Sequence, residues 1–142
     1  SLRLVGSEMC IRDRYTIGQR QGLGIGGIKD KDELPWYVYG KNISKNEIYV
    51  CQGVDNQLLY TENITLDKIH WINDLKEFKH LDCLVQIRHR HKPVKCIIEF
   101  NKGFRVMFDE EIRGVAPGQS AVFYKDNLCL GGGVIEARNN DL

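Results

Sequence analysis

A cluster of cationic and imidazole side chains between Cys83 and Ile98 is the strongest candidate for chemistry in this 142-residue chain. The stretch contains four Lys or Arg residues and two histidines, and no Asp or Glu. Cations held in a row on a rigid support suit the phosphate backbone of a nucleic acid. A solvated outer strand is the other interpretation, and composition alone does not separate the two.

Read as a β-strand, the stretch divides its side chains between two faces. One face carries Val85, Ile87, His89 and His91, and the other carries Gln86, Arg88, Arg90 and Lys92. The apolar start attaches such a strand to a core and leaves the far face as a row of cations. We therefore expect a strand over 81–91 that presents its cations to a polyanion.

A metal site is the second chemistry that these residues suggest. His89 and His91 would share one face of the strand, and zinc accepts both imidazole and thiolate ligands. The nearest thiols, Cys83 and Cys96, are not spaced like zinc-ribbon ligands, and the chain has no C-x-x-C pair. We expect no metal site. The five cysteines are odd in number and widely spaced, which favours free, mostly buried thiols in a reducing cytoplasm.

A glycine-rich segment formally fits a dinucleotide-binding motif. Gly22, Gly24 and Gly27 satisfy the pattern G-x-G-x-x-G. A dinucleotide loop must open a helix whose N-terminus faces the pyrophosphate, but the residues that follow, 29–35, are charged and end at a proline. We expect tight turns here instead. No nucleophile and base stand at a recognisable spacing, so the sequence predicts no catalytic residue.

The bulk composition restricts the possible partners. Hydrophobic residues make up 42% of the chain and charged residues 27%, which is typical of globular proteins. No uncharged apolar run approaches the roughly 20 residues that a membrane helix needs, so no membrane partner is expected. The formal net charge of +1 means that a nucleic acid would be bound through the local placement of cations.

The elements that must position the cationic stretch are strands. Alternating apolar residues and turn signals predict strands from Trp36 onward, with a hairpin turn at 44–46. In the second half, the predicted strands are 81–91, 94–100, 104–109, 119–124, 128–130 and 134–137, with a triple glycine leading into the last.

These elements predict a mainly all-β fold. We expect a small, incomplete central β domain over 15–76, followed by a small antiparallel β-barrel of about six strands over 77–142. The polar, aperiodic segment 74–80 is the expected boundary between them. Residues 1–14 show no period of either kind and are interpreted as a non-native leader.

Six segments together resemble the C-terminal part of the bacterial tRNA-specific 2-thiouridylases, sulfurtransferases that act on the wobble uridine of some tRNAs. These segments are Tyr15–Gly27, Pro35–Val38, His70–Ile72, Ile87–Arg90, Val115–Tyr124 and Cys129–Ile135. Their order and spacing agree with the family, and the resemblance covers nearly everything after Arg14.

The resemblance implies a three-part enzyme. An N-terminal ATP-pyrophosphatase domain, working with ATP and magnesium, adenylates the C2 oxygen of the uridine. A cysteine persulfide, assisted by a second cysteine and loaded by a sulfur-donor or persulfide-relay protein, then delivers the sulfur. In the family both cysteines lie upstream of the segment that matches Tyr15–Gly27. We therefore expect this chain to dock tRNA, to bind no cofactor and to be inactive alone.

The family's tRNA contacts in the barrel carry over to Arg88, His89 and Gln119, and Arg90 completes the arginine pair. Here His89 replaces the tyrosine of the family pattern, and imidazole can still stack on a base or donate to a phosphate. The arginines can fork onto phosphate oxygens. Gln119 follows Pro-Gly on a turn, where its amide can reach a sugar or base edge.

Two further departures from the family lie beside these residues. Gln86 stands where the family has a lysine, and His91 stands where it has a glutamine. An alternative function stays open, because a β-barrel interaction module with no catalytic role would use the same cations to bind an acidic partner protein.

Overall fold

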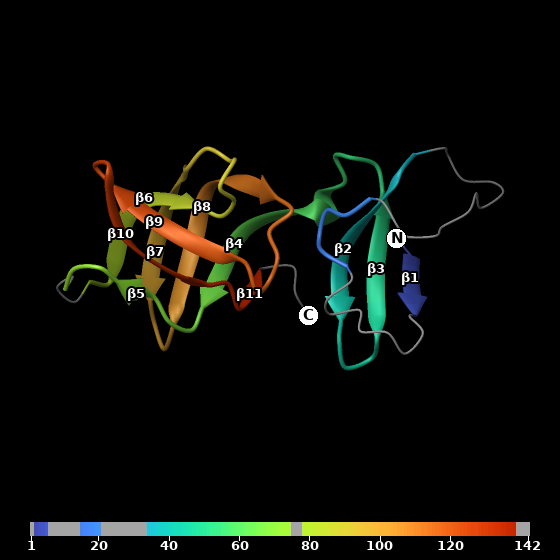
Figure 1. Ribbon diagram of the computed structural model, residues 1–142, viewed down its shortest axis with the longest axis horizontal. Coiled ribbons are helices and arrows are strands. Elements are labelled where there is room, and N and C mark those ends of the chain that lie inside the picture. Colours follow the sequence, from blue (N-terminus) through green and yellow to red (C-terminus); the bar gives the residue numbers. More distant parts are fainter. Residues whose placement is uncertain (1, 6–14, 21–33, 75–77, 139–142) are drawn as a thin grey trace. The chain divides into compact units, whose positions relative to one another are not determined.

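The computed structural model describes residues 2–5, 15–20, 34–74 and 78–138, which form two compact units. Apart from one short 3-10 helix, η1 (Gln57–Leu59), every regular element of these residues is a strand, so the predicted all-β fold is confirmed. Figure 1 shows the two units, each built on its own sheet. Among the described residues no helix is long and apolar enough to cross a membrane.

The first unit, 1–60, is a three-stranded antiparallel sheet in the order β1-β3-β2. Strands β2 (Trp36–Asn42) and β3 (Glu47–Gln52) form the predicted hairpin, whose turn includes Asn46 at φ 54°. Strand β1 (Leu2–Val5) pairs with the other edge of β3. The sequence did not predict this strand, because the pairing comes from a distant segment and not from any local alternation.

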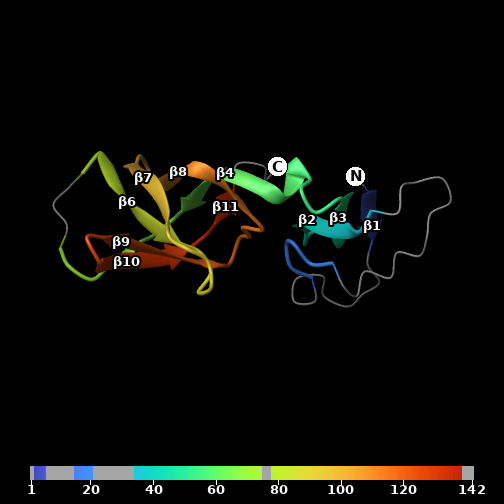
Figure 2. The same ribbon diagram turned by 90° about the horizontal axis from the view of Figure 1, so that it is seen from above.

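The second unit, 61–142, contains one curled antiparallel sheet in the order β11-β4-β8-β7-β6-β9-β10-β5. Figure 2 shows the curl from above. Its strands are β4 (Tyr60–Leu66), β5 (His70–Trp71), β6 (His80–Gln86), β7 (Val94–Phe100), β8 (Phe104–Arg113), β9 (Ser120–Lys125), β10 (Leu128–Val134) and β11 (Ala137–Arg138). Six of these strands, β6 to β11, lie within 77–142, where about six were expected, and β4 and β5 join the sheet from residues before that range. In this order the end strands of the sheet, β11 and β5, do not pair with each other.

The division between the units falls after Tyr60, earlier than the expected 74–80 segment. The reason is that β4 and β5 pair with strands of the second unit, β4 with β11 and β5 with β10. Polarity alone suggested a boundary here, but only long-range pairing decides which sheet the preceding strands join.

The core of the second unit follows the two-residue period of its strands. Cys83 and Val85 on β6 are buried together with Ile98 on β7 and Phe123 on β9. Side chains of one strand alternate between faces, so the residues between them are left toward solvent. Trp71 packs on Phe123 with its ring centroid 6.4 Å away, so the short strand β5 is tied to this core.

Two hairpin turns lie where the sequence placed them. Asp126 and Asn127 have φ angles of 50° and 67°, the pair of positive values typical of a type I′ turn between β9 and β10. Lys102, at φ 54°, and Gly103, at φ 142°, join β7 to β8. The second of these turns sets the register of β7 against β8, and β7 is one of the two strands that flank the cationic stretch.

The triple glycine lies inside β10, so the prediction that it only leads into a last strand is wrong. A Cβ added at Gly133 would lie 2.3 Å from the carbonyl oxygen of Lys68. Glycine is therefore needed in this strand for close approach of a neighbouring backbone. Hydrophobic periodicity cannot reveal such an approach.

Candidate nucleic-acid interface

The cationic stretch is mostly a loop. Strand β6 ends at Gln86 and β7 begins at Val94, so the predicted strand through His91 is wrong. We call residues 87–93 the β6–β7 loop. Within it, the backbone N–H of His91 donates to the carbonyl of Arg88 over 3.0 Å, which turns the chain back toward β7. Pro93 has no N–H to contribute to a ladder, which also favours a loop here.

The side chain of Gln86 holds this loop from its base. Its Nε2 amide donates to the carbonyl oxygens of His89 and His91, over 3.1 and 2.8 Å. These are carbonyls of an exposed segment that would otherwise depend on water. The loop therefore has an internal hydrogen-bond framework, formed by one side chain and one backbone turn.

Arg88 connects the β6–β7 loop to a second segment 26 residues further along the chain. Its Nη2 donates to the carbonyl of Gly114, at 2.8 Å, just after β8 ends. Gly114 has φ +72°, and a Cβ there would lie 3.0 Å from the same nitrogen. Arg88 is half-buried, and the remaining N–H groups of a guanidinium, which has five, are the ones that could meet a ligand.

Gln119 closes a tight turn with its own side chain. We call residues 116–119 the glutamine turn. The Oε1 of Gln119 accepts from the N–H of Ala116 at 3.0 Å, and the backbone N–H of Gln119 donates to the Ala116 carbonyl at 3.3 Å. Gly118, at φ +90°, supplies the positive angle that position i+2 of a type II turn requires.

The glutamine turn is also fixed to the sheet behind it. Gly118 donates to the carbonyl of Ile135, and Ile135 donates back to the carbonyl of Gln119, both over 2.8 Å. Within the described residues the Nε2 amide of Gln119 has no partner, and the side chain is half-buried. Its acceptor is thus used by the fold and its donors are free for a ligand.

The first unit contains the same turn. In residues 16–19, the Oε1 of Gln19 accepts from the N–H of Thr16 at 3.0 Å, with Gly18 at φ +86°. Gly18 and Gln19 exchange backbone hydrogen bonds with Val38, over 2.7 and 3.0 Å. The glutamine at the end of such a turn therefore has a folding role that is independent of any ligand.

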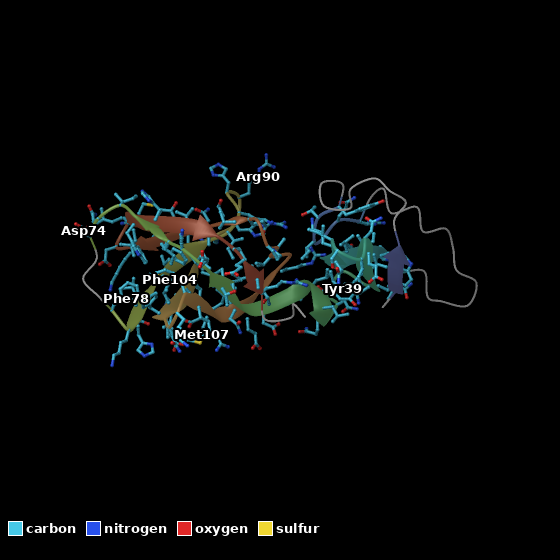
Figure 3. The ribbon with its side chains drawn as sticks, turned by 90° about the horizontal axis from the view of Figure 1, so that it is seen from below. Tyr39, Asp74, Phe78, Arg90, Phe104 and Met107 are labelled. Atoms are coloured by element: carbon cyan, nitrogen blue, oxygen red, sulfur yellow. The ribbon has the colours of Figure 1, made fainter. Side chains whose placement is uncertain are left out.

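The structure brings most of the predicted contact residues together. Arg88 joins the β6–β7 loop to the segment that leads, two residues later, into the glutamine turn with Gln119. His89 and Arg90 are exposed on the loop, and Figure 3 shows the Arg90 side chain pointing away from the sheet. His91 and Lys92 are exposed beside them. The cations therefore lie at the tip of a loop and do not form a row along a strand.

Two residues that shape this surface were not predicted. Gln86 was noted only as a departure from the family pattern, and Gly114 was not considered. A glycine directly after a strand is a signal for a positive φ angle, so Gly114 could have been suspected as a turn position. The two hydrogen bonds of Gln86 leave no mark in the sequence.

The cysteines proposed for the alternative metal site face each other in the core. Cys83 and Cys96 are directly opposed on β6 and β7, with their sulfur atoms 3.6 Å apart. The hydrogen bond from Cys96 lowers the pKa of Cys83, and the same bond together with burial raises the pKa of Cys96. His89 and His91 lie on the exposed loop, and the described residues contain no group of three or more His, Cys, Asp or Glu that could hold a metal ion. The glycine motif at 22–27 and Cys10 lie outside the described residues.

Comparison with known proteins defines the class to which this fold and surface belong. Residues 61–135, more than half of the chain, match the family model of the aminomethyltransferase β-barrel domain. Residues 12–52 match the model of the tRNA methyl transferase PRC-barrel domain. The two matches fall in the two compact units of the chain, one in each.

Curated relatives make the assignment more specific. The chain is 45% identical over 126 residues to the tRNA-specific 2-thiouridylase MnmA of Buchnera aphidicola subsp. Baizongia pistaciae, which covers 87% of this chain and 34% of the relative. It is 45% identical over 123 residues to the protein of the same name from Pseudomonas aeruginosa strain LESB58, covering 86% and 33%. The chain belongs to the tRNA-specific 2-thiouridylase family. It spans about a third of the length of the curated relatives it matches.

Proposed function

We propose that this chain is the tRNA-docking part of a tRNA 2-thiouridylase. The observation that carries the proposal is the hydrogen bond from Arg88 to the carbonyl of Gly114. It joins the two segments that the family resemblance assigns to tRNA, which are far apart in the sequence. Arg88, His89, Arg90 and Gln119 then belong to one surface at the ends of β6 and β8.

The chemistry of this surface suits a phosphate backbone. Arg90 and Lys92 are exposed on a loop that contains no acidic residue, and His89 offers an exposed ring for a base or a phosphate. The free amide donors of Gln119 fit a phosphate, ribose or base oxygen. Contacts of this kind position an RNA and add affinity, while the choice of the modified base depends on other parts of the enzyme.

Adenylation and sulfur transfer are proposed to take place in parts of the full-length relatives that this chain does not match. ATP with magnesium is proposed to bind in those same parts. The persulfide cysteines and the sulfur-donor protein are likewise proposed to belong to the full-length enzyme. The chain alone is expected to bind tRNA without modifying it.

Salt dependence of tRNA binding tests the proposal. Each phosphate contact should steepen the fall of log affinity with log salt by about 0.7 to 0.9. Arg90→Ala should weaken binding and reduce that slope by about one contact. Arg105→Ala is the matched control, because Arg105 is also exposed but lies on β8 opposite Glu99 in the strand register, toward the other end of β7. An equal effect of the two variants would show only a general influence of net charge and would refute the site.

The alternative of an acidic protein partner predicts a different outcome. In that case an acidic peptide of similar charge would compete with tRNA for the chain at similar concentrations. Preference for tRNA over the peptide, lost in Arg90→Ala and Gln119→Ala but kept in Arg105→Ala, would favour RNA docking.

A further inference from the structure

We infer that Gln86 is a positioning residue that holds the β6–β7 loop in the conformation that binds RNA. The inference rests on the proposed function for its RNA part, and on the geometry of the loop for the rest. Gln86 is the last residue of β6, half-buried, and therefore placed by the sheet. The loop that it holds contains Arg88, His89 and Arg90.

The hydrogen bonds of Gln86 account for the shape of the loop. A primary amide has two N–H donors, and Nε2 of Gln86 lies within hydrogen-bonding distance of two acceptors, the carbonyls of His89 and His91. With those carbonyls drawn toward the strand end, the intervening Arg90 is left at the tip and exposed. The side chain of Gln86 thus acts on the backbone on both sides of Arg90.

The same bonds make Gln86 a poor direct ligand of RNA. Both amide hydrogens are used within the loop, and the remaining oxygen can only accept a hydrogen bond, so it has nothing to donate to a phosphate. Its contribution to binding has to come through the loop. Ordering a loop before a ligand arrives removes part of the entropic cost of binding, and that benefit needs no additional ionic contact.

This distinction between positioning and contact is measurable. Gln86→Ala and Gln86→Glu both remove the two donated bonds, and the glutamate also places a negative charge against two carbonyls. We expect each to weaken tRNA binding about fivefold to tenfold, the effect of losing one or two exposed neutral hydrogen bonds. The salt slope should stay unchanged in Gln86→Ala, because no phosphate contact is removed, whereas Arg90→Ala lowers it.

Hydrogen exchange gives a readout that does not depend on RNA. The N–H of His91 bonds to the carbonyl of Arg88 inside the loop, so its protection should fall in Gln86→Ala. Gln86→Lys keeps a donor group at the same place and should restore much of that protection. Gln52→Ala is the matched control, because Gln52 also ends a strand, β3, and donates to a backbone carbonyl, that of Leu34 at 3.4 Å.

The outcomes separate the inference from the proposed function. Absence of salt-dependent tRNA binding by the unchanged chain would overturn the proposed function, and with it the RNA part of the inference. If the chain binds tRNA but Gln86→Ala binds equally well, the inference alone is overturned. Weaker binding with a reduced salt slope would also overturn it, because Gln86 would then act as an ionic contact. Weaker binding with an unchanged slope and lost protection of His91 is the result expected.

Discussion

Substitution of Gly133 by alanine should strongly destabilise the second unit. The added Cβ would lie 2.3 Å from the carbonyl oxygen of Lys68 and 2.9 Å from Cδ2 of Leu66. A carbonyl of the backbone cannot rotate away like a side chain, so β10 or residues 66–68 must move. Overpacking of this kind costs up to about 3 kcal/mol.

Gly118→Ala provides the matched control for this change. Gly118 has φ +90°, but a new Cβ there would meet open space. Alanine at this position would therefore carry only the cost of the positive φ angle. After subtraction of the entropy that alanine removes from the unfolded chain, this cost is about 1 kcal/mol. Gly133 is not among the glycines with positive φ, so its cost is steric. The two variants separate the two physical terms, and the expected difference is about 2 kcal/mol.

Thermal unfolding followed by the fluorescence of Trp71 measures that difference. Trp71 packs against Phe78 and Phe104, at ring distances of 5.7 and 6.0 Å, so its emission reports on the core of the second unit. A Trp36→Phe background removes the signal of the first unit. For a unit of this size, 2 kcal/mol corresponds to a midpoint lower by roughly 10 °C. If Gly133→Ala unfolds at or above the midpoint of Gly118→Ala, the steric argument for the triple glycine is wrong.

Three further predictions concern the candidate interface and the core beneath it. Gln119→Glu keeps the acceptor that closes the turn but loses the amide donors. The affinity for tRNA should therefore fall, while the unfolding midpoint should change by less than about 4 °C. Gln19→Glu, in the equivalent turn of the first unit, serves as the control. Arg88→Ala should both lower tRNA affinity and reduce hydrogen-exchange protection of the 114–119 segment, and unchanged protection would show that the bond to Gly114 does not order it. Mild peroxide should oxidise Cys83 and Cys96 to a disulfide, because their sulfur atoms are 3.6 Å apart. The lowered pKa of Cys83 makes its thiolate the group that attacks the peroxide. Mass spectrometry should show the loss of two hydrogen atoms in the unchanged chain and no such loss in Cys96→Ser.

Local patterns predicted those parts of the fold that local physics determines. The alternation of β6 and β7 and the Asp126–Asn127 turn were found because strand period and turn chemistry are properties of neighbouring residues. The predicted strand was nevertheless too long, because it included most of the β6–β7 loop. The sequence still alternates between two kinds of side chain in this loop. The amide of Gln86, however, donates to loop carbonyls that would be paired with a neighbouring strand if the segment were itself a strand.

The residues of the candidate site remain a prediction, and the contacts that hold them in place were not predicted. Arg88 and Gln119 came from the family pattern, which carries no information on how they are supported. The bond between Arg88 and Gly114 spans two loops, and the clash that excludes a side chain from Gly133 involves a backbone carbonyl of another segment. Long-range contacts of this kind leave no periodic trace, so single-sequence reasoning could not reach them.

The glutamine turn has one more consequence, which concerns what it can recognise. The N–H of Ala116 occupies the oxygen of the Gln119 amide and so determines which way the group faces. A free glutamine can flip and satisfy either a donor or an acceptor, but this one cannot flip without breaking its own turn. The free Nε2 donors therefore favour a partner that presents an oxygen or an unprotonated ring nitrogen, while a group that only donates can use no more than the second lone pair of Oε1. The fold thus sets a preference in hydrogen-bond polarity at this position before any ligand arrives.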